Sequence, residues 1–548
     1  MSSYKSMDAG FTVQKKFQER SEELLRFLRR KNESSLDSMK KKKESQQERQ
    51  KASEPGHVKE WQPSTQLQEN ERFLKKELHG CEDVKWHPIE KEGKNVALLL
   101  FADGMIDQES FTFRLMPQLK EWMKNLPQGE KEVKENIPFP LNAFPTPVKM
   151  EELMEGLFSG MALLLIDGMK EIFFLPLSHP PKRNPEESKT QISILGPRDG
   201  FTEEIGVNIA LIRKRLKTSS LKVEFYDFGH RSHTRVALLY MGDILNPGIL
   251  QQLKERLADV DLDLLSSHRQ LADFLIRSPF NLFPIFSYSG RPDYAVESLI
   301  RGRFILLVDG VPLALIGPIN FYFLLHSPED PYYMNLPISF ARILRIAAFL
   351  ISIFMPGFWI ALSTHHQDMI PLPLLATTIV DRKGVPFPAG VEAFVMAFLF
   401  SLLVEAGFRL PSGIGQTLSV VGGLIIGDAA IAAGITSPIL VVVISISAVA
   451  SFALVNQNLV LIVSILRLFS LAMGTFFGIF GFLLSAYYLV IILANMRPFG
   501  LPYLAPLPGS GAKDLSKAFL VPKRKWVKRR PIFLKTVDPT RKKEGSEP

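Results

Sequence analysis

Residues 343–362 read ILRIAAFLISIFMPGFWIAL. Roughly 20 predominantly apolar helical residues are needed to cross a hydrocarbon layer of about 30 Å, and this stretch meets that requirement. Further runs at 391–403 with its flanks, 438–455 and 468–493 are also apolar enough to be spans. The sequence therefore predicts a membrane protein with a polytopic α-helical part.

The chain in front of these runs is much more polar. The mean hydropathy of the 548 residues is only +0.09, because a polar half and an apolar half are averaged. This length exceeds one ordinary domain of ~100–200 residues. No secretory signal precedes the polar half, and the single cysteine, Cys81, excludes an intramolecular disulfide framework. We therefore expect the polar half to be cytosolic.

Short apolar runs ending in a turn with Asp and Gly recur in the polar half, at 96–104, 161–168, 236–243 and 304–310. Such runs indicate buried strands that enter tight turns. Hairpins are expected at 161–176 and 304–318, and helices at 203–216, 247–258 and 271–276. The runs indicate either two related α/β subdomains or simply buried strands that look alike.

These patterns give the expected domain organisation. Residues 1–75 form a basic, disordered or helical extension with a candidate helix at 17–29. An α/β region follows at 76–335, with a possible subdivision near residue 185. The transmembrane domain is expected at 336–500 and a basic cytosolic tail at 501–548.

The basic tail bears on topology. Positive charge beside a span favours the cytosolic side, and two cytosolic ends require an even number of crossings, about four to six. Attraction to lipid explains this charge more simply than binding to nucleic acid. Pro356 inside the first run, and Pro371 and Pro373 in the short run at 369–380, predict broken or re-entrant segments. Such segments are more typical of channels and transporters than of simple anchors.

Four small residues spaced four positions apart predict a smooth stripe along one face of a helix. A stripe of this kind lets a second helix backbone approach closely. Two interpretations remain open: packing within the chain, or a seam between subunits or beside a moving helix. The stripe consists of Gly415, Ser419, Gly423 and Gly427.

Several ionisable residues fall inside the apolar runs, where they must face protein or water. Asp428 is the strongest candidate for a pore or cavity, although a buried hydrogen bond to Thr436 or Ser437 would also explain it. Glu405 and Arg409 are four residues apart and are expected to neutralise each other. Arg467 also lies in an apolar run and must likewise face protein or water. The pore or cavity candidates are Asp428, Thr436, Glu392 and Glu405.

The chain contains no phosphate-binding loop, HExxH motif or paired cysteine ligands. We therefore expect no enzyme activity, cofactor or metal, and we interpret His365 and His366 as part of a polar turn at the membrane edge. The apolar half shows no internal repeat of the kind found in secondary transporters. A pathway would most simply form between subunits arranged around a central axis.

Ordered motifs lie between residues 90 and 507, among them GPRDGFTE at 196–203, EAGFRLP at 405–411, VVGGLIIGDAA at 420–430 and FGLPY at 499–503. Together they resemble the A subunits of the bacterial spore germination GerA family. This chain has Asp428 where that family often has Gln, a difference that bears on ion preference.

The resemblance implies a germinant receptor subunit of the spore inner membrane, with the α/β region and the C-terminal tail in the spore core. It implies as partners a permease-like B subunit that senses the nutrient and a lipoprotein C subunit, and oligomers that form a nutrient-gated cation channel. The alternative is a non-conducting scaffold or signalling subunit of the same receptor.

Overall fold

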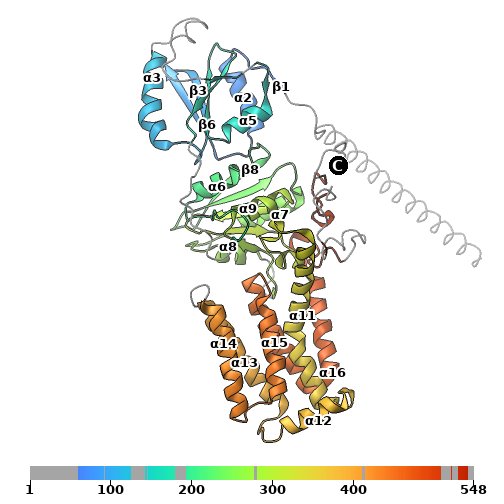
Figure 1. The fold of residues 1–548 in the computed structure, drawn as a ribbon. Coiled ribbons are helices and arrows are strands. Elements are labelled where there is room, and N and C mark those ends of the chain that lie inside the picture. Colours follow the sequence, from blue (N-terminus) through green and yellow to red (C-terminus); the bar gives the residue numbers. More distant parts are fainter. Residues whose placement is uncertain are drawn as a thin grey trace, which may run out of the picture. The chain divides into compact units, whose positions relative to one another are not determined.

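The computed structural model describes residues 60–91, 93–124, 142–144, 146–178, 193–276, 281–409, 414–507, 520 and 529–540. The predicted helix at 17–29 and the expected subdivision near residue 185 lie outside these ranges. The described chain has an α/β part followed by long helices (Figure 1). This division agrees with the fold class predicted from the sequence.

The first α/β unit is built on a five-stranded antiparallel sheet in the order β2-β3-β6-β7-β4. Helices α2, α3 and α5 belong to this unit, and the short strands β1 (Glu60–Trp61) and β5 (Val148–Lys149) form a separate pair. The bounds are α2 (Leu67–Glu77), β2 (Val84–Lys91), β3 (Lys94–Ala102), η1 (Ser110–Leu115), α3 (Met116–Lys124), β4 (Asn142–Ala143), α5 (Met150–Leu157), β6 (Met161–Ile166) and β7 (Ile172–Pro176).

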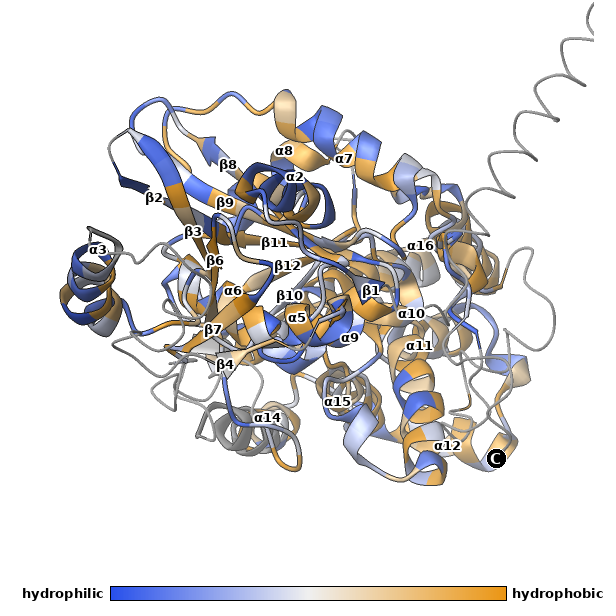
Figure 2. Ribbon diagram, turned by 90° about the horizontal axis from the view of Figure 1, so that it is seen from above, coloured by the Kyte–Doolittle hydropathy of each residue, from blue (hydrophilic) through white to orange (hydrophobic). Residues whose placement is uncertain are grey.

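Strand β6 is apolar on both faces because both faces of this sheet are covered. Leu163 and Leu165 enter the core shared with α2 and α5, whereas Leu164 and Ile166 enter the core shared with η1 and α3. Side chains alternate between the two faces of a strand, so a strand covered on both sides is a continuous apolar run. Figure 2 shows the central strands β3 and β6 as hydrophobic and α2 as largely hydrophilic.

The second α/β unit has a five-stranded antiparallel sheet in the order β10-β12-β11-β9-β8. The hairpins expected at 161–176 and 304–318 are confirmed as β6-β7 and β11-β12. The three expected helices correspond to α6, α7 and α8. The bounds are α6 (Ile205–Arg213), β8 (Leu221–Phe228), β9 (Thr234–Met241), α7 (Pro247–Ala258), α8 (His268–Leu275), β10 (Ser287–Ser289), α9 (Pro292–Ile300), β11 (Phe304–Val308) and β12 (Ala314–Gly317).

The two units have matching construction. In each, a helix precedes two strands, a further helical segment and strand follow, and a last helix leads into the second hairpin. The hairpin turn also caps the first helix in the same way. Asp167 Oδ1 accepts from the backbone N–H of Leu67 at 3.0 Å, and Asp309 Oδ1 accepts from that of Ile205 at 3.1 Å. The repeated Asp-Gly turns therefore hold equivalent helices.

The structure places the start of the first unit earlier than the boundary at residue 76. Helix α2 begins at Leu67, and Leu67 and Leu74 are buried in the core of this unit. Its hydrophilic composition, with six charged residues in LQENERFLKKE, resembles that of the preceding extension. For this reason the composition did not reveal that one narrow face packs on the sheet.

The C-terminal part is helical, with short α10 (Phe321–Leu324) leading to it. In the described chain, three helices are long and apolar enough to cross a membrane: α11, α13 and α16. Helix α12 is short and lies across one end of the bundle (Figure 1). The bounds are α11 (Asn335–His365), α12 (Leu372–Asp381), α13 (Ala389–Arg409), α14 (Ile414–Ala432), α15 (Pro438–Phe452) and α16 (Gln457–Asn495).

Helix α16 is a hairpin of two helical arms. Gly478 has φ 60° and ψ −142°, which is not a helical conformation. Residues on opposite sides of it meet: the Oγ atoms of Ser470 and Ser485 are 3.4 Å apart, and the ring centroids of Phe469 and Tyr488 are 5.5 Å apart. The prediction of a single span at 468–493 is therefore wrong, because the chain reverses inside that range.

The chain returns to the second α/β unit after α16. Tyr503 donates its hydroxyl hydrogen to the carbonyl of Pro284 at 2.8 Å, and Asn320 donates to the carbonyl of Ala505 at 2.6 Å. Farther along, Arg530 Nε donates to the carbonyl of Ile300 at 2.9 Å. Arg530, expected to belong to a lipid-attracted tail, is instead a structural residue. The bundle thus begins and ends at the same α/β unit.

Gly478→Ala tests the reversal in α16. The conformation of Gly478 strongly favours glycine, and an added Cβ would lie 2.9 Å from Cε1 of His366 and 3.0 Å from Cβ of His365. We expect a loss of about 1–3 kcal/mol in stability, measured by thermal unfolding in detergent. Gly206→Ala, where the nearest atom is 4.0 Å away, is the control. Equal melting of both variants would contradict the hairpin.

Candidate functional site in the membrane helices

Glu392 lies in the first turn of α13 and is buried. Its Oε1 accepts hydrogen bonds from the hydroxyl of Thr436 at 2.9 Å and from the hydroxyl and backbone N–H of Ser437 at 2.8 and 2.5 Å. Its Oε2 lies 3.9 Å from Nε of Arg382 and has no hydrogen-bond partner among the described residues. The carboxylate therefore joins the start of α13 to the turn before α15.

Asp428 does not belong to this cluster. It lies on α14 and is exposed in the single chain. The hydroxyl groups of Thr436 and Ser437, which the sequence offered as alternative partners of Asp428, donate to Glu392 instead. The structure thus brings together two of the predicted residues, Glu392 and Thr436, and leaves Asp428 apart.

Glu405 is half-buried near the other end of α13. The side chain of Arg409, its expected partner, lies outside the described residues. Over the described ranges, no group of three or more His, Cys, Asp or Glu residues is arranged to hold a metal ion.

Two members of the small-residue stripe lie against helices of the same chain. A Cβ at Gly423 would be 3.1 Å from Cε1 of Phe400 on α13, and one at Gly427 would be 3.0 Å from Cγ1 of Val441 on α15. These glycines therefore allow close packing within the chain. The surroundings of Gly415 and Ser419 lie outside the described side chains, so a seam between subunits stays a prediction.

Arg467 on α16 is a buried charge that links three helices. Its Nε donates to the carbonyl of Ser352 on α11 at 2.9 Å, and its Nη2 donates to the carbonyl of Ser447 on α15 at 3.3 Å. The hydroxyl of Ser447 donates to the same Ser352 carbonyl at 2.8 Å. In a regular helix the N–H of residue 356 would bond to Ser352, but Pro356 has none.

The arginine thus replaces a donor that proline removes. Water is absent from a bilayer core, so a carbonyl freed by proline must find a partner inside the protein. Arg467 Nη1 has no hydrogen-bond partner in the described chain, and no carboxylate forms an ion pair with Arg467 there. A buried charge of this kind is costly at membrane depth, so the hydrogen bonds to Ser352 and Ser447 must offset that cost. In the sequence, the only sign of this unpaired carbonyl is the proline four residues after the serine.

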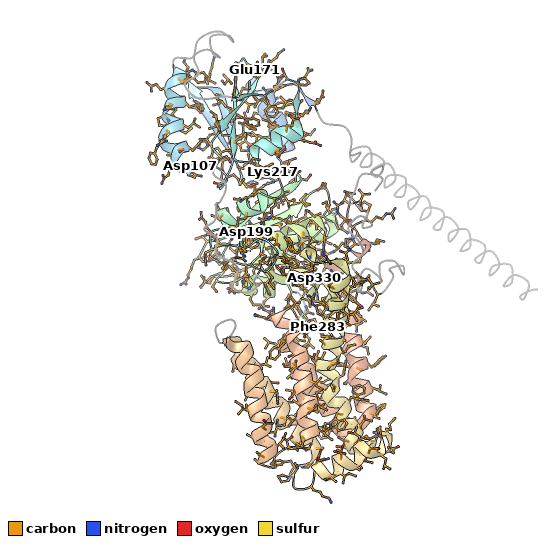
Figure 3. All side chains as sticks on the ribbon, viewed as in Figure 1. Asp107, Glu171, Asp199, Lys217, Phe283 and Asp330 are labelled. Carbon is orange, nitrogen blue, oxygen red and sulfur yellow. The ribbon has the colours of Figure 1, made fainter. Side chains whose placement is uncertain are left out.

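Adjacent acidic residues hold the segment between the second α/β unit and α11. Asp330, labelled in Figure 3, is buried and pairs with Arg345 at 3.0 Å and with Arg342 at 3.4 Å on the first turns of α11. Glu329 pairs with Arg291, which precedes α9. One acid thus contacts the membrane helix while its neighbour contacts the α/β unit. Sequence reasoning did not single out either acid.

His326 lies in the same connecting segment. Its Nδ1 is 2.5 Å from the carbonyl oxygen of Tyr322, so the neutral imidazole donates this hydrogen bond. Burial of the imidazole, together with the guanidinium groups of Arg342 and Arg301, holds the pKa of His326 well below its usual range. The imidazole is therefore neutral near pH 7.

Comparison with known proteins gives consistent matches. A family model described as the Bacillus/Clostridium GerA spore germination protein matches residues 72–533. The chain is 41% identical over 485 residues to spore germination protein XA of Bacillus anthracis, which covers 87% of this chain and 98% of that protein. It is 34% identical over 460 residues to spore germination protein KA of Bacillus subtilis strain 168, covering 82% of this chain and 84% of that protein.

One solved structure is also similar to this chain. It is the crystal structure of the N-terminal domain of the A subunit of the Bacillus megaterium spore germinant receptor GerK3. The match has a TM-score of 0.37 and 23% sequence identity, and it covers 48% of this chain and 98% of that one.

A double-mutant cycle tests the substitution of arginine for the missing N–H. Pro356→Ala restores a backbone donor to the Ser352 carbonyl, so Arg467→Met should destabilise the Pro356→Ala protein less than it destabilises the unmodified protein. We expect a coupling of at least ~0.5 kcal/mol in thermal unfolding. Pro373→Ala, in α12, is the control and should give additive effects. Additivity at Pro356 would show that the two residues do not share the carbonyl.

The depressed pKa of His326 predicts a pH dependence. In the unfolded chain the imidazole binds a proton below pH ~6.5, whereas in the folded chain it does not, so stability is lost as the pH falls through ~6.5. The expected loss is about 1.4 kcal/mol per pH unit. In His326→Asn, thermal unfolding should depend less on pH, while the exposed His79→Asn should behave like the unmodified protein. A His326→Asn profile with unchanged slope would contradict this assignment.

Proposed function

Since the chain belongs to the GerA family of Bacillus/Clostridium spore germination proteins, we propose that it acts in nutrient-triggered spore germination as the A subunit of a germinant receptor. The matched residues, 72–533, include most of the first α/β unit, all of the second and all the membrane helices. The family consists of spore germination proteins and not of enzymes, in agreement with the sequence prediction.

The proposed topology places both ends of the bundle on one side of the membrane. Helices α11, α13, α14 and α15 each cross once, and the two arms of α16 cross in opposite directions. The contacts of Tyr503 with Pro284, and of Asp330 with Arg345, support this arrangement, because the first and last helices meet the same α/β unit. The resulting number of crossings is even and lies within the range of about four to six.

The location and partners that we propose follow from the family. The protein resides in the spore inner membrane, with the α/β units and the C-terminal segment in the spore core. It works with a permease-like B subunit, which senses the nutrient, and with a lipoprotein C subunit.

We propose further that several copies form a nutrient-gated cation channel. The observation that carries this proposal is the exposure of Asp428 on an apolar helix, close to Ile425, which is 62% exposed. A carboxylate facing hydrocarbon costs several kcal/mol, so Asp428 requires water or a second chain beside it. Copies arranged around an axis would provide both, and a ring of carboxylates attracts cations.

A gating route is consistent with the contacts at the junction. A nutrient acts on the channel only if the receptor binds it more tightly in one global state than in the other. Movement of the second α/β unit would be passed through Glu329 and Asp330 to the first turns of α11. The bend at Pro356 and the reversal at Gly478 are then the points at which the helices rearrange.

The second candidate is a non-conducting scaffold or signalling subunit. It is favoured by the internal pairing of Glu392 with Thr436 and by the hydrogen bonds of Arg467 to backbone carbonyls. These polar groups are accommodated inside one chain and require no aqueous pathway. The two candidates therefore differ mainly in what surrounds Asp428.

Ion flux through the purified protein, reconstituted with its partner subunits, distinguishes them. For a channel lined by Asp428, Asp428→Asn should lower the preference for cations over anions several-fold while the mass of the assembly stays the same. Asp368→Asn, an exposed carboxylate in the turn after α11, is the matched control.

Two results would count against the channel. Flux and selectivity that are identical in Asp428→Asn would remove this residue from the pathway. A monomeric protein that carries no flux, alone or with its partners, would favour the scaffold.

A further inference from the structure

A small cavity lies where the end of α11 meets α12. Its volume is about 220 Å³. One part of the wall is apolar, formed by Ile370, Leu375 and Ile379. Another part is polar and includes Gln367 and Thr378. The lining therefore suits a molecule that is apolar at one end and polar at the other.

Two consecutive cations lie on this wall at the C-terminal end of α12. Arg382 and Lys383 both line the cavity. The C-terminal end of a helix carries partial negative charge, which favours cations there. Lys383 is exposed, and no ion pair of its amino group occurs in the described chain. The cavity therefore offers positive charge to an anionic group.

The charge of Arg382 is only partly compensated. Its nearest acid is Glu392, whose Oε2 is 3.9 Å from Arg382 Nε, and neither of these two atoms has a hydrogen-bond partner in the described chain. The other oxygen of Glu392 is occupied by Thr436 and Ser437. The carboxylate therefore does not satisfy the hydrogen-bonding capacity of the guanidinium group of Arg382, whose side chain is 28% exposed beside the cavity.

The outer surface of α12 is apolar. Leu372 is 78% exposed and Val380 is 61% exposed, and Met369 just before the helix is 62% exposed. A short helix with exposed apolar side chains and a basic end matches an element that lies in the membrane interface, with its cations at the level of the headgroups. This surface makes acyl chains the natural neighbours of the cavity.

From these observations we propose that the cavity between α11 and α12 binds the phosphate headgroup of an anionic phospholipid. Arg382 and Lys383 contact the phosphate, and the wall of Ile370, Leu375 and Ile379 receives the first part of an acyl chain. The placement of this end of the bundle in the leaflet opposite the α/β units rests on the proposed membrane topology. Basic pockets between membrane helices bind anionic headgroups on the cytoplasmic side of membranes, and this cavity offers the same chemistry in the opposite leaflet.

The test is the binding of phosphatidylglycerol to the full-length protein in detergent, measured by native mass spectrometry against phosphatidylcholine. We expect a preference for phosphatidylglycerol. Lys383→Gln should weaken that binding about fivefold, and Arg382→Gln/Lys383→Gln should weaken it further. The matched control is Lys94→Gln/Lys170→Gln, which removes two exposed charges from the first α/β unit and should leave binding unchanged.

Lys383→Gln alone keeps the test valid if loss of Arg382 disturbs the buried Glu392. Equal binding of the two lipids, or unchanged phosphatidylglycerol binding in Lys383→Gln, would overturn the proposal. Displacement of the lipid by inorganic phosphate at a concentration equal to that of the lipid would also overturn it, since the acyl wall would then add nothing to the affinity. Resistance to inorganic phosphate supports it.

Ion flux measured in vesicles of phosphatidylcholine with and without phosphatidylglycerol separates this proposal from the channel. Lipid preference that depends on Lys383, in a protein without flux, would sustain the lipid site and reject the channel. Ion flux in a protein without lipid preference would sustain the channel and reject the lipid site.

Discussion

The carbonyl that Pro356 leaves without a donor is the constraint around which the membrane helices pack. Ser352 receives hydrogen bonds from Arg467 on α16 and from Ser447 on α15, so three helices meet at one oxygen atom. Gly357, which follows Pro356, allows the helices to approach this closely, because a Cβ at this position would lie 2.6 Å from the carbonyl oxygen of Ser470. A side chain there would push α16 away from α11 and break the hydrogen bond from Arg467 to the Ser352 carbonyl. Close backbone contact and polar satisfaction therefore depend on each other.

The fold of the α/β units was largely predictable from sequence because its signals are local. A short apolar run followed by Asp and Gly describes a buried strand and its turn, as at Asp167 and Asp309. The reversal in α16 was not predictable by the same rules. Turns in water are recognised by polar residues, whereas the residues around Gly478 are apolar on both sides. Length and hydropathy alone therefore treated two antiparallel arms as one continuous span.

The candidate site shows a different limit. Sequence identifies an ionisable residue in an apolar run, but not whether a distant segment supplies its donors. Glu392 accepts three hydrogen bonds from Thr436 and Ser437, which lie more than forty residues further along the chain. Asp428 is much closer to these two residues in sequence, yet its side chain is exposed. At the junction, Glu329 resembled an ordinary loop acid because its partner Arg291 is also remote. The sequence thus predicted which residues carry charge, but not which groups surround them.

The second α/β unit holds both ends of the membrane bundle, and this restricts how a signal travels. Its contacts reach α11 through Asp330 and the chain after α16 through Tyr503, so the first helix and the last arm move with it. Helix α14, which carries Asp428, packs on α13 and α15 instead, through Gly423 and Gly427. A displacement of the α/β unit would therefore act on α14 only through α13 and α15. The Arg467 cluster joins α15 to α11 and α16, and it lies on that route.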